Sequence, residues 1–588
     1  MTATTAPPPT DRSRFARLWQ RELDHYPSFG PRMVSLGIVV LTTILFYYQY
    51  YAISGVGDQV IAGTHISFVF FVNINVVSAL LSALTSIAAG ITDRYGRANV
   101  VTLGVLLCAL VCLFGFPNVH SGWGVAVLYT LLGGIEGTVL VATPALVRDF
   151  SPQLGRASAM GFWTLGPVAG SLIVSVVVSN TITHLTAWQD QYIIAGCVGL
   201  GVFVIAALWL RELPPALRDQ ILVSERDRAL LEARAKGIDV EAALKKPVRQ
   251  MLHLDIVGSA LAISLLLLIY FVAVGFFPIF FQTIFNYSAS KANALGNWMW
   301  GFQAGSLIII GYLSDRIRVR KPFMLVGALG AIVCTYVLID HTAQPHTSYY
   351  SFVVLLVVLS IFMGMAFAPW MASFTETVER RNPALTATGL AVWGLIIRAV
   401  VTISAFILPY VVNTVTTLVQ DGPAVEALAN GQDPSLNASQ NAFVKAVVAD
   451  QSILGKVAGA AKYSEQVEAA SKLPPAARTA ALATVPPADV AYLNEYGTPL
   501  QDPPVLAALA KLEAKGPAVE KAVAASPGQW QTYFWIALGG QVVFIPLIFL
   551  MAGFWDPRKA KRQEEEHNAM VGAEMAKLLA TQGGPADA

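Results

Sequence analysis

Long apolar segments alternate with short polar ones along most of the chain. A helix that crosses a bilayer needs roughly 20 mostly apolar residues, and it satisfies its own backbone hydrogen bonds within the hydrocarbon. Twelve segments of this chain meet that requirement. They lie near residues 33–53, 67–89, 100–117, 123–147, 158–180, 191–210, 255–277, 292–313, 323–340, 350–373, 386–412 and 531–554. The pattern therefore predicts an all-α membrane protein with twelve transmembrane helices.

Two short sequences recur at equivalent places and divide the twelve segments into two sets of six. Residues 89–94 (AGITDR) correspond to residues 311–316 (GYLSDR), and residues 188–195 (WQDQYIIA) correspond to residues 530–537 (WQTYFWIA). The separation between the two repeated sequences is larger in the second half than in the first. This difference indicates an insertion between the eleventh and twelfth segments. We expect two pseudo-symmetric six-helix bundles, because alternating access uses two halves that rock against each other.

Basic residues are concentrated in alternate loops. Arginine and lysine clusters follow the second, sixth, eighth, tenth and twelfth segments, whereas the loops around Asp58, His120, His184 and His341 contain none. Because cytoplasmic loops carry the excess of Lys and Arg, we expect both termini in the cytoplasm and a multi-pass protein of the cell membrane. The predicted parts are a cytoplasmic tail at 1–32, a first bundle at 33–210, a cytoplasmic linker at 211–254, a second bundle at 255–412 and 530–555, an extracytoplasmic insertion at 413–529 and a cytoplasmic tail at 556–588.

The predicted insertion differs in composition from the rest of the chain. It is rich in alanine and poor in large apolar residues, and three Pro-Pro pairs each precede an Ala/Leu-rich stretch. Proline is favoured in the first turn of a helix, so we expect short helices but no dense core. Two roles remain open: a helical cap on the membrane bundles, or a domain that binds an extracytoplasmic partner. The linker contains spaced leucines and alanines among charges and is predicted to form an amphipathic helix.

Composition supports the membrane class and argues against several others. Hydrophobic residues make up 55% of the chain and charged residues only 13%, far below the globular average of about 25% charged. A net charge of +2 gives no reason to expect a nucleic-acid partner. The 4 cysteines all lie in apolar segments, and no phosphate-binding loop precedes a helix. We therefore expect no enzyme activity, no cofactor, no metal site and no ATP as the energy source.

The repeated turn resembles a motif of the major facilitator superfamily, Gly-x-x-x-Asp-Arg-x-Gly-Arg. The matching residues are Asp93, Arg94, Gly96 and Arg97 in the first half, and Asp315 and Arg316 in the second. The second copy has Arg318 in place of the later glycine. The resemblance implies a conformational gate, in which Asp93 contacts the start of the eleventh span near residues 386–389 when the cytoplasmic side is closed. Alternatively, these charges serve only orientation and solubility.

Two ionisable residues lie deep in predicted spans. Glu136 is near the middle of the fourth span and Arg398 near the middle of the eleventh. A charge at the bilayer centre costs about 2.5–3.5 kcal/mol or more, so each side chain should face the bundle interior or a wet cavity. A shift of 228 residues lays Gly170 of the fifth span over Arg398. Arg398 could bind a carboxylate or phosphate, and Glu136 could carry a proton. A purely structural Glu136–Arg398 ion pair is the alternative.

Further polar and aromatic residues in the spans are weaker site candidates. They are Asn73, Asn297, Trp300, Gln303, Trp393 and Tyr48. Tyr47, Tyr48, Gln49, Tyr50 and Tyr51 lie at the end of the first predicted span, where an interfacial aromatic belt is favoured over a cavity wall.

Together these features predict a secondary transporter in the lipid bilayer. It would move a small organic solute, anionic and carboxylate-like, coupled to protons, by a rocker-switch mechanism. One alternative is a proton antiporter for amphipathic drugs. Another, from a different class, is a transporter-like receptor or envelope scaffold that acts through the insertion.

Overall fold

The structure is a computed structural model. It describes residues 21–23, 25–86, 95–150, 165–214, 217, 247–382, 385–496, 502–562, 565–566, 569–570 and 573. These residues form helices and one isolated parallel β-bridge between Glu22 and Glu212. The chain divides into two compact units, Met1–Val412 with Gly528–Ala588, and Asn413–Pro527.

The first half of the larger unit provides six spans. Its helices are α2 (Phe29–Gly55), α3 (Gly57–Thr64), α4 (Phe68–Ser86), α6 (Arg97–Leu110), α7 (Gly122–Phe150), α9 (Gly166–Thr181) and α10 (Trp188–Trp209). The third span continues from α6 through a π-helical turn at Val111–Gly115 and a 3-10 turn at Phe116–Asn118. The short α3 connects the first and second spans.

The second half repeats this plan. Its helices are α13 (Pro247–Met251), α14 (Leu254–Leu266), α15 (Leu268–Phe285), α16 (Ala289–Ile317), α17 (Lys321–Thr342), α18 (Tyr349–Arg381), α19 (Thr386–Val411) and α27 (Pro503–Leu547). The seventh span consists of α14 and α15, which are interrupted at Leu267. The twelfth span belongs to α27, a continuous helix of 45 residues that begins inside the predicted insertion.

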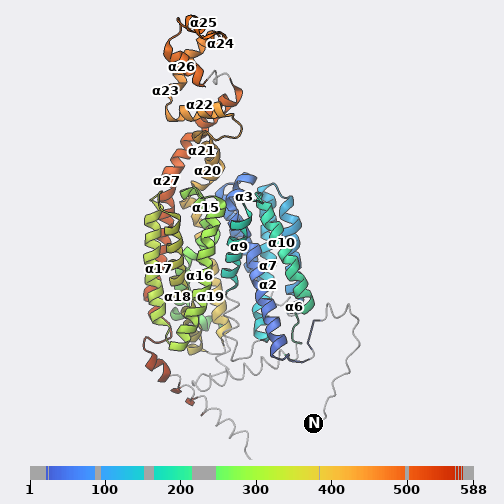
Figure 1. The fold of residues 1–588 in the computed structure, drawn as a ribbon. Coiled ribbons are helices and arrows are strands. Elements are labelled where there is room, and N and C mark those ends of the chain that lie inside the picture. Colours follow the sequence, from blue (N-terminus) through green and yellow to red (C-terminus); the bar gives the residue numbers. More distant parts are fainter. Residues whose placement is uncertain are drawn as a thin grey trace, which may run out of the picture. The chain divides into compact units, whose positions relative to one another are not determined.

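The helices agree with twelve spans in two bundles. Within the described chain, 10 helical stretches are long and apolar enough to cross a membrane. Two further helices complete the set: α9, which is shorter, and α16, whose Asn293, Asn297 and Gln303 lower its hydropathy. In Figure 1 the blue-to-teal helices of the first half and the green-to-yellow helices of the second half form two groups.

Small residues set the packing within each bundle. In the first half, a Cβ added at Gly133 would lie 2.2 Å from Ser78 Oγ, and one at Gly137 would lie 2.2 Å from the Ser82 carbonyl oxygen. These glycines let α4 approach α7 closely, as small residues do between membrane helices. In the second half, Gly330 of α17 packs under the ring of Phe362 of α18 in the same way.

The two bundles contact each other through three pairs of spans and through the connecting helix α3. Helix α9 packs against α16, α4 packs against α19, and both α2 and α3 contact α15. We call the end of the larger unit that holds α3 the α3 end, and the end that holds Glu212, Pro247 and Arg320 the linker end. The arginine pattern predicts that the α3 end is extracytoplasmic.

The smaller unit is a set of short helices. They are α20 (Val415–Gln420), α21 (Gly422–Asn430), α22 (Ala438–Ala449), α23 (Ser452–Ala460), α24 (Ser464–Ser471), α25 (Pro475–Ala481) and α26 (Pro487–Tyr496), together with the first part of α27. The short helices were expected, but the absence of a core was a wrong prediction. Phe443, Val444 and Val505 are fully buried in one cluster, and Val467 and Leu493 belong to a second. The few large residues recur at helical spacing and so meet in the interior. A binding role for this unit stays a prediction.

The predicted linker helix lies mostly outside the described residues. The segment before the first span is anchored at the linker end: Leu23 N–H donates to the Glu212 carbonyl oxygen over 2.9 Å. The buried Arg21 guanidinium donates to Thr102 Oγ1 over 2.8 Å and to the Ala206 carbonyl oxygen over 3.0 Å. The chain thereby connects its N-terminal segment to the third and sixth spans.

Candidate transport site

Glu136 lies at the middle of α7 and faces the bundle interior. Its side chain is buried, with 4% of the residue exposed. Gly133 and Gly137 flank it and bring α4 close at this level. No hydrogen bond to the Glu136 carboxylate is found within the described part of the chain. The fold therefore holds a carboxylate at the predicted depth without a fixed partner.

Arg398 lies on α19 in the opposite bundle and is exposed. Neighbouring Leu395 is 71% exposed, so this face of α19 is open. The guanidinium is close enough to interact electrostatically with Glu136 of α7 and with Tyr47 of α2. Among the described residues, no ion pair joins Arg398 to Glu136. A locked, buried Glu136–Arg398 pair is thus not what this conformation contains.

Tyrosines surround Glu136, and this group was not predicted. We call Tyr47, Tyr50, Tyr51, Tyr129 and Tyr270 the tyrosine cluster. The first four interact electrostatically with Glu136, and Tyr270 interacts with Tyr47 and Tyr51. The ring of Tyr50 stacks on that of Tyr129 with centroids 4.9 Å apart. The belt interpretation was wrong for Tyr47, Tyr50 and Tyr51 because α2 continues to Gly55, which places these rings inside the bundle.

The structure brings only some of the predicted side chains to this site. Trp300 joins it, because the residue is only 4% exposed and its ring lies edge-on to that of Tyr270, with the ring centroids 5.5 Å apart. Tyr48 does not: it is buried on another face of α2, close to Cys112 of the third span. Trp393 packs 5.3 Å from Trp370 within the second bundle.

Two predicted amides have no bonded partner at this site. Asn73 is half-buried in α4 and makes no hydrogen bond to another described residue through its amide. Gln303 is 2% exposed, and its Oε1 has no hydrogen-bond partner in the described structure. Both amides therefore keep hydrogen-bonding capacity inside the bundle.

The two bundles are joined at the α3 end. Asn297 Nδ2 donates to Ser179 Oγ over 3.1 Å, Ser290 Oγ donates to the Ser179 carbonyl oxygen over 2.6 Å, and Asn293 Nδ2 donates to the Gly55 carbonyl oxygen over 2.8 Å. Every hydrogen bond between the halves that connects two described residues lies at this end. Asn297 thus belongs to the closure of the α3 end. Asn293 was missed, since its partner lies 238 residues away in sequence.

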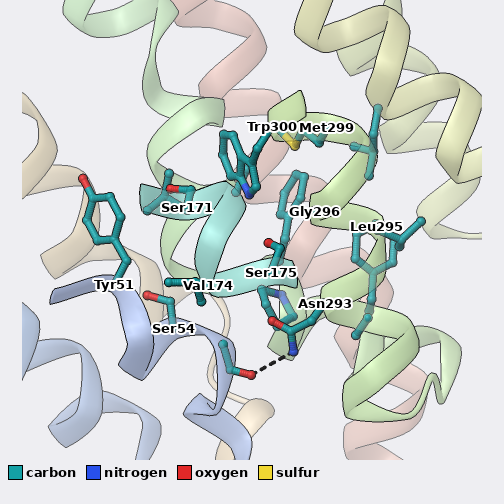
Figure 2. Close-up of a pocket in the computed structure, with 18 residues that line it drawn as sticks. Tyr51, Ser54, Ser171, Val174, Ser175, Asn293, Leu295, Gly296, Met299 and Trp300 are labelled. Atoms are coloured by element: carbon teal, nitrogen blue, oxygen red, sulfur yellow. Dashed lines mark hydrogen bonds between the residues drawn. The ribbon is translucent and has the colours of Figure 1, made fainter. Parts of the chain in front are cut away.

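A small cavity remains in this closed interface. It is lined by Tyr51, Ser54 and Ser175 of the first half and by Asn293 and Trp300 of the second (Figure 2). Its volume of about 30 Å³ admits roughly two water molecules, since each needs about 10–15 Å³. An organic solute does not fit there. Tyr51 and Trp300 connect this cavity to the tyrosine cluster.

The predicted gate in the first half is described only in part, because Asp93 and Arg94 lie outside the described residues. Gly96 has φ +88°, and a Cβ there would lie 2.3 Å from Glu212 Oε1. Arg97 Nη1 donates to Asp149 Oδ2 over 2.7 Å, and both side chains are buried. The Arg97 backbone N–H also donates to Glu212 Oε2 over 2.7 Å, so the turn is held by Asp149 of the fourth span and by Glu212, which follows the sixth.

The equivalent turn in the second half uses different residues. Arg318, which replaces the glycine, adopts φ +61°, in the left-handed region. Arg320 pairs with Asp315 over 2.6 Å and with Glu376 over 3.2 Å, while Arg316 is exposed. Both residues thus have a positive φ, but their conformations differ, because ψ is 131° at Gly96 and 27° at Arg318.

No metal centre is found in the part of the chain that the structure describes: no three His, Cys, Asp or Glu side chains lie close enough together to hold an ion. The chemistry that the site offers is ion recognition. It presents one cation, one carboxylate and several phenol groups at the middle of the membrane spans.

Comparison with known proteins gives the family. The sequence profile of the Major Facilitator Superfamily matches residues 39–405. The hexuronate transporter of Escherichia coli (strain K12) is 23% identical over 61% of this chain and 83% of its own. Probable anion transporter 3, chloroplastic, of Arabidopsis thaliana is 24% identical over 42% of this chain, and the match spans only 49% of that protein. The quinolone resistance protein NorB of Staphylococcus aureus (strain MW2) is 23% identical over 54% of this chain and 75% of its own.

Solved structures agree on the fold. An inward-facing, occupied bacterial homologue of the human lysosomal transporter Spinster aligns with a TM-score of 0.50 and 16% identity, over 84% of this chain and 97% of its own. A D-xylose–proton symporter aligns with a TM-score of 0.50 and 14% identity, over 65% of this chain and 90% of its own. The profile match over more than half of the sequence, on a fold of two six-helix bundles, shows that this chain is an integral membrane transporter, not an enzyme, and belongs to the Major Facilitator Superfamily.

Proposed function

We propose that this protein is a proton-coupled secondary transporter of a small organic carboxylate. It binds the solute between its two bundles and moves it by rocking them about the midplane. Both termini lie in the cytoplasm, and the protein works in the cell membrane. The observation that carries the proposal is that the two midplane charges are separate. Arg398 is exposed, Glu136 is buried, and no ion pair joins them.

Arg398 supports recognition of the carboxylate. A guanidinium offers a planar fork of donors that matches a carboxylate in a bidentate way. The open face of α19 leaves this fork accessible. Relatives of the chain are named for anions, hexuronates and quinolones, and both hexuronates and quinolones carry a carboxylate.

Glu136 supports proton coupling. A carboxylate in an apolar span can alternate between a charged and a neutral form only if no fixed cation holds it charged. Glu136 meets this condition in the described structure, since Arg398 influences it without bonding to it. The phenols around Glu136 can donate hydrogen bonds to the charged form when the bundles move.

A second candidate function is proton-driven export of amphipathic aromatic compounds. The tyrosine cluster with Trp300 favours it, because aromatic faces bind aromatic solutes. Both candidates share the same site and the same family.

Substitution of Arg398 tests the proposal. Purified protein is reconstituted into liposomes, and transport is screened with carboxylates, beginning with glucuronate and norfloxacin. Arg398→Gln should abolish transport of the accepted carboxylate, and Arg398→Lys should keep part of it, because the charge stays while the fork is lost. Arg562→Gln removes an exposed arginine that follows the twelfth span and should leave transport unchanged.

Two outcomes would contradict the proposal. One is an absence of carboxylate transport by wild-type protein that is folded and oriented in the liposomes. The other is unchanged carboxylate transport by a normally folded Arg398→Gln variant.

A further inference from the structure

The two midplane charges face one set of aromatic side chains but do not bind each other. Tyr47 interacts electrostatically with both Glu136 and Arg398, so it lies near both charges. Glu136 belongs to the first bundle and Arg398 to the second. A solute held between the bundles therefore meets a negative group on one side and a positive group on the other.

The surroundings of Glu136 suit an organic cation. The rings of Tyr50 and Tyr129 are stacked with an interplanar angle of 15°. The ring centroids of Tyr47 and Tyr51 lie 5.5 Å apart, and the two ring planes are tilted by 40°. Aromatic faces attract ammonium groups, and they do so more strongly where water is excluded. A carboxylate among such rings adds charge neutralisation, because a buried charge is costly until it is paired.

The surroundings of Arg398 suit an organic anion. Gly394 lies one turn before Arg398 and has no side chain, and its Cβ position lies 3.6 Å from Arg398 Nη1, so the guanidinium lies over this glycine. Leu395 beside it is exposed and offers only apolar contact. Among the described residues, no hydrogen bond or ion pair to Arg398 is found, so its donors can bind a carboxylate of the solute.

We propose that the transported solute is a zwitterion, with its carboxylate on Arg398 and its ammonium group between Glu136 and the tyrosine cluster. This inference rests on the proposed function and narrows its substrate class. A solute with both charges neutralises both side chains at once, which lets the bundles close over the site without an unpaired ion. A simple anion neutralises only Arg398.

The same geometry sets the coupling. The ammonium group and the proton compete for the Glu136 carboxylate, because each neutralises the same negative charge. Binding of the zwitterion should therefore release a proton from Glu136, and return of the empty carrier requires that the proton bind again. The transporter then exchanges solute for protons across the membrane.

A matched ligand series on one skeleton tests this assignment. Norfloxacin carries both charges, N-acetylnorfloxacin keeps only the carboxylate, and norfloxacin methyl ester keeps only the amine. Hexanoate, 6-aminohexanoate and hexylamine form a second series with a flexible skeleton. Binding to the full chain in detergent is measured by isothermal titration calorimetry. In at least one series the zwitterion should bind about tenfold or more tightly than either partner, since a charge-assisted contact is lost in each partner.

Two variants then assign the charges. Glu136→Gln should weaken binding of the zwitterion about tenfold and leave the carboxylate-only ligand unchanged. Arg398→Gln should weaken both of these ligands and leave the amine-only ligand unchanged. Glu565→Gln and Arg562→Gln are the controls, because these residues near the C-terminus are exposed and lie outside the membrane spans.

The outcomes separate this inference from the proposed function. The proposal of a zwitterionic solute is overturned if, in neither series, the wild-type protein binds the zwitterion more tightly than the singly charged ligands. This comparison does not depend on the folding of any variant. If the carboxylate-only ligands bind as tightly and Arg398→Gln still weakens them, the proposed function stands and only the zwitterion fails. If Arg398→Gln changes no affinity, the proposed function fails as well.

Discussion

Two helices at equivalent places in the internal repeat, α9 and α19, differ at one equivalent position. A Cβ at Gly170 of α9 would lie 2.5 Å from Tyr47 Cβ and 3.0 Å from the backbone of α2, so this helix is fixed by close packing. The equivalent residue in α19 is Arg398, which is exposed. One fold therefore uses the same position as a helix contact in one half and as an accessible charge in the other. The asymmetry places both the tyrosines and the cation beside Glu136.

The largest expected effect comes from exchanging these two roles. Gly170→Leu should destabilise the protein by about 3 kcal/mol or prevent folding, because its side chain would overlap the backbone of α2. Arg398→Leu should fold normally, since the open face of α19 accommodates the side chain. Thermal unfolding in detergent, followed by size-exclusion chromatography, measures both. Equal stability of the two variants would show that the halves do not differ in this way.

A second comparison concerns the two repeated turns. Gly96→Ala should destabilise by about 1–2 kcal/mol or more, because alanine at φ +88° is strained and its Cβ would overlap Glu212. Arg318→Gly should instead change stability by less than about 1 kcal/mol, since relief of the left-handed conformation is offset by the greater freedom of the unfolded chain. The midpoint of thermal unfolding checks both changes. A larger loss of stability for Arg318→Gly than for Gly96→Ala would contradict this comparison of the two turns.

The smallest expected effect is a pH dependence at the α3 end. Burial raises the pKa of Asp58 in α3 above its ordinary value of 3.8. The folded protein therefore binds this proton more tightly than the unfolded chain, and stability falls as the pH rises from 3.8 through the raised pKa. Asp58→Asn removes this loss, so the variant should gain stability over wild type at neutral pH and lose that advantage below pH 3.8.

Asp340 provides the control for Asp58. It lies at the same end in the second half, and its side chain is 58% exposed. Asp340→Asn should not reproduce the effect in unfolding curves recorded across the same pH range. A gain for Asp58→Asn that is the same at every pH would exclude titration as its cause.

Much of the fold could be predicted from the sequence because membrane spans are local features. Each needs about 20 apolar residues, and the repeated turns locate the two halves. The prediction failed where a helix runs past its apolar segment, as α27 does by starting at Pro503. It also failed in the smaller unit, where Phe443 and Val444 find partners that composition did not indicate.

The site could be predicted only where a single residue was anomalous. Glu136 and Arg398 stand out because charges are rare in apolar spans. The tyrosine cluster could not be found, since Tyr129 and Tyr270 meet the tyrosines of α2 only through helix packing. Trp393 was wrongly expected at the site for the same reason. It lies close to Arg398 in sequence, but the sequence does not give the direction in which its ring packs.

The central claim is that Glu136 carries a proton independently of Arg398, and a Glu136→Gln variant tests it most directly. In liposomes loaded with the transported solute, the variant should still exchange labelled for unlabelled solute. It should fail to accumulate solute against a gradient when driven by a pH difference, because glutamine cannot change its charge. Wild-type stability of the variant would agree with the absence of an ion pair, whereas a locked pair predicts a loss of about 3–5 kcal/mol. A stable variant that still accumulates solute with unaltered pH dependence would contradict the account.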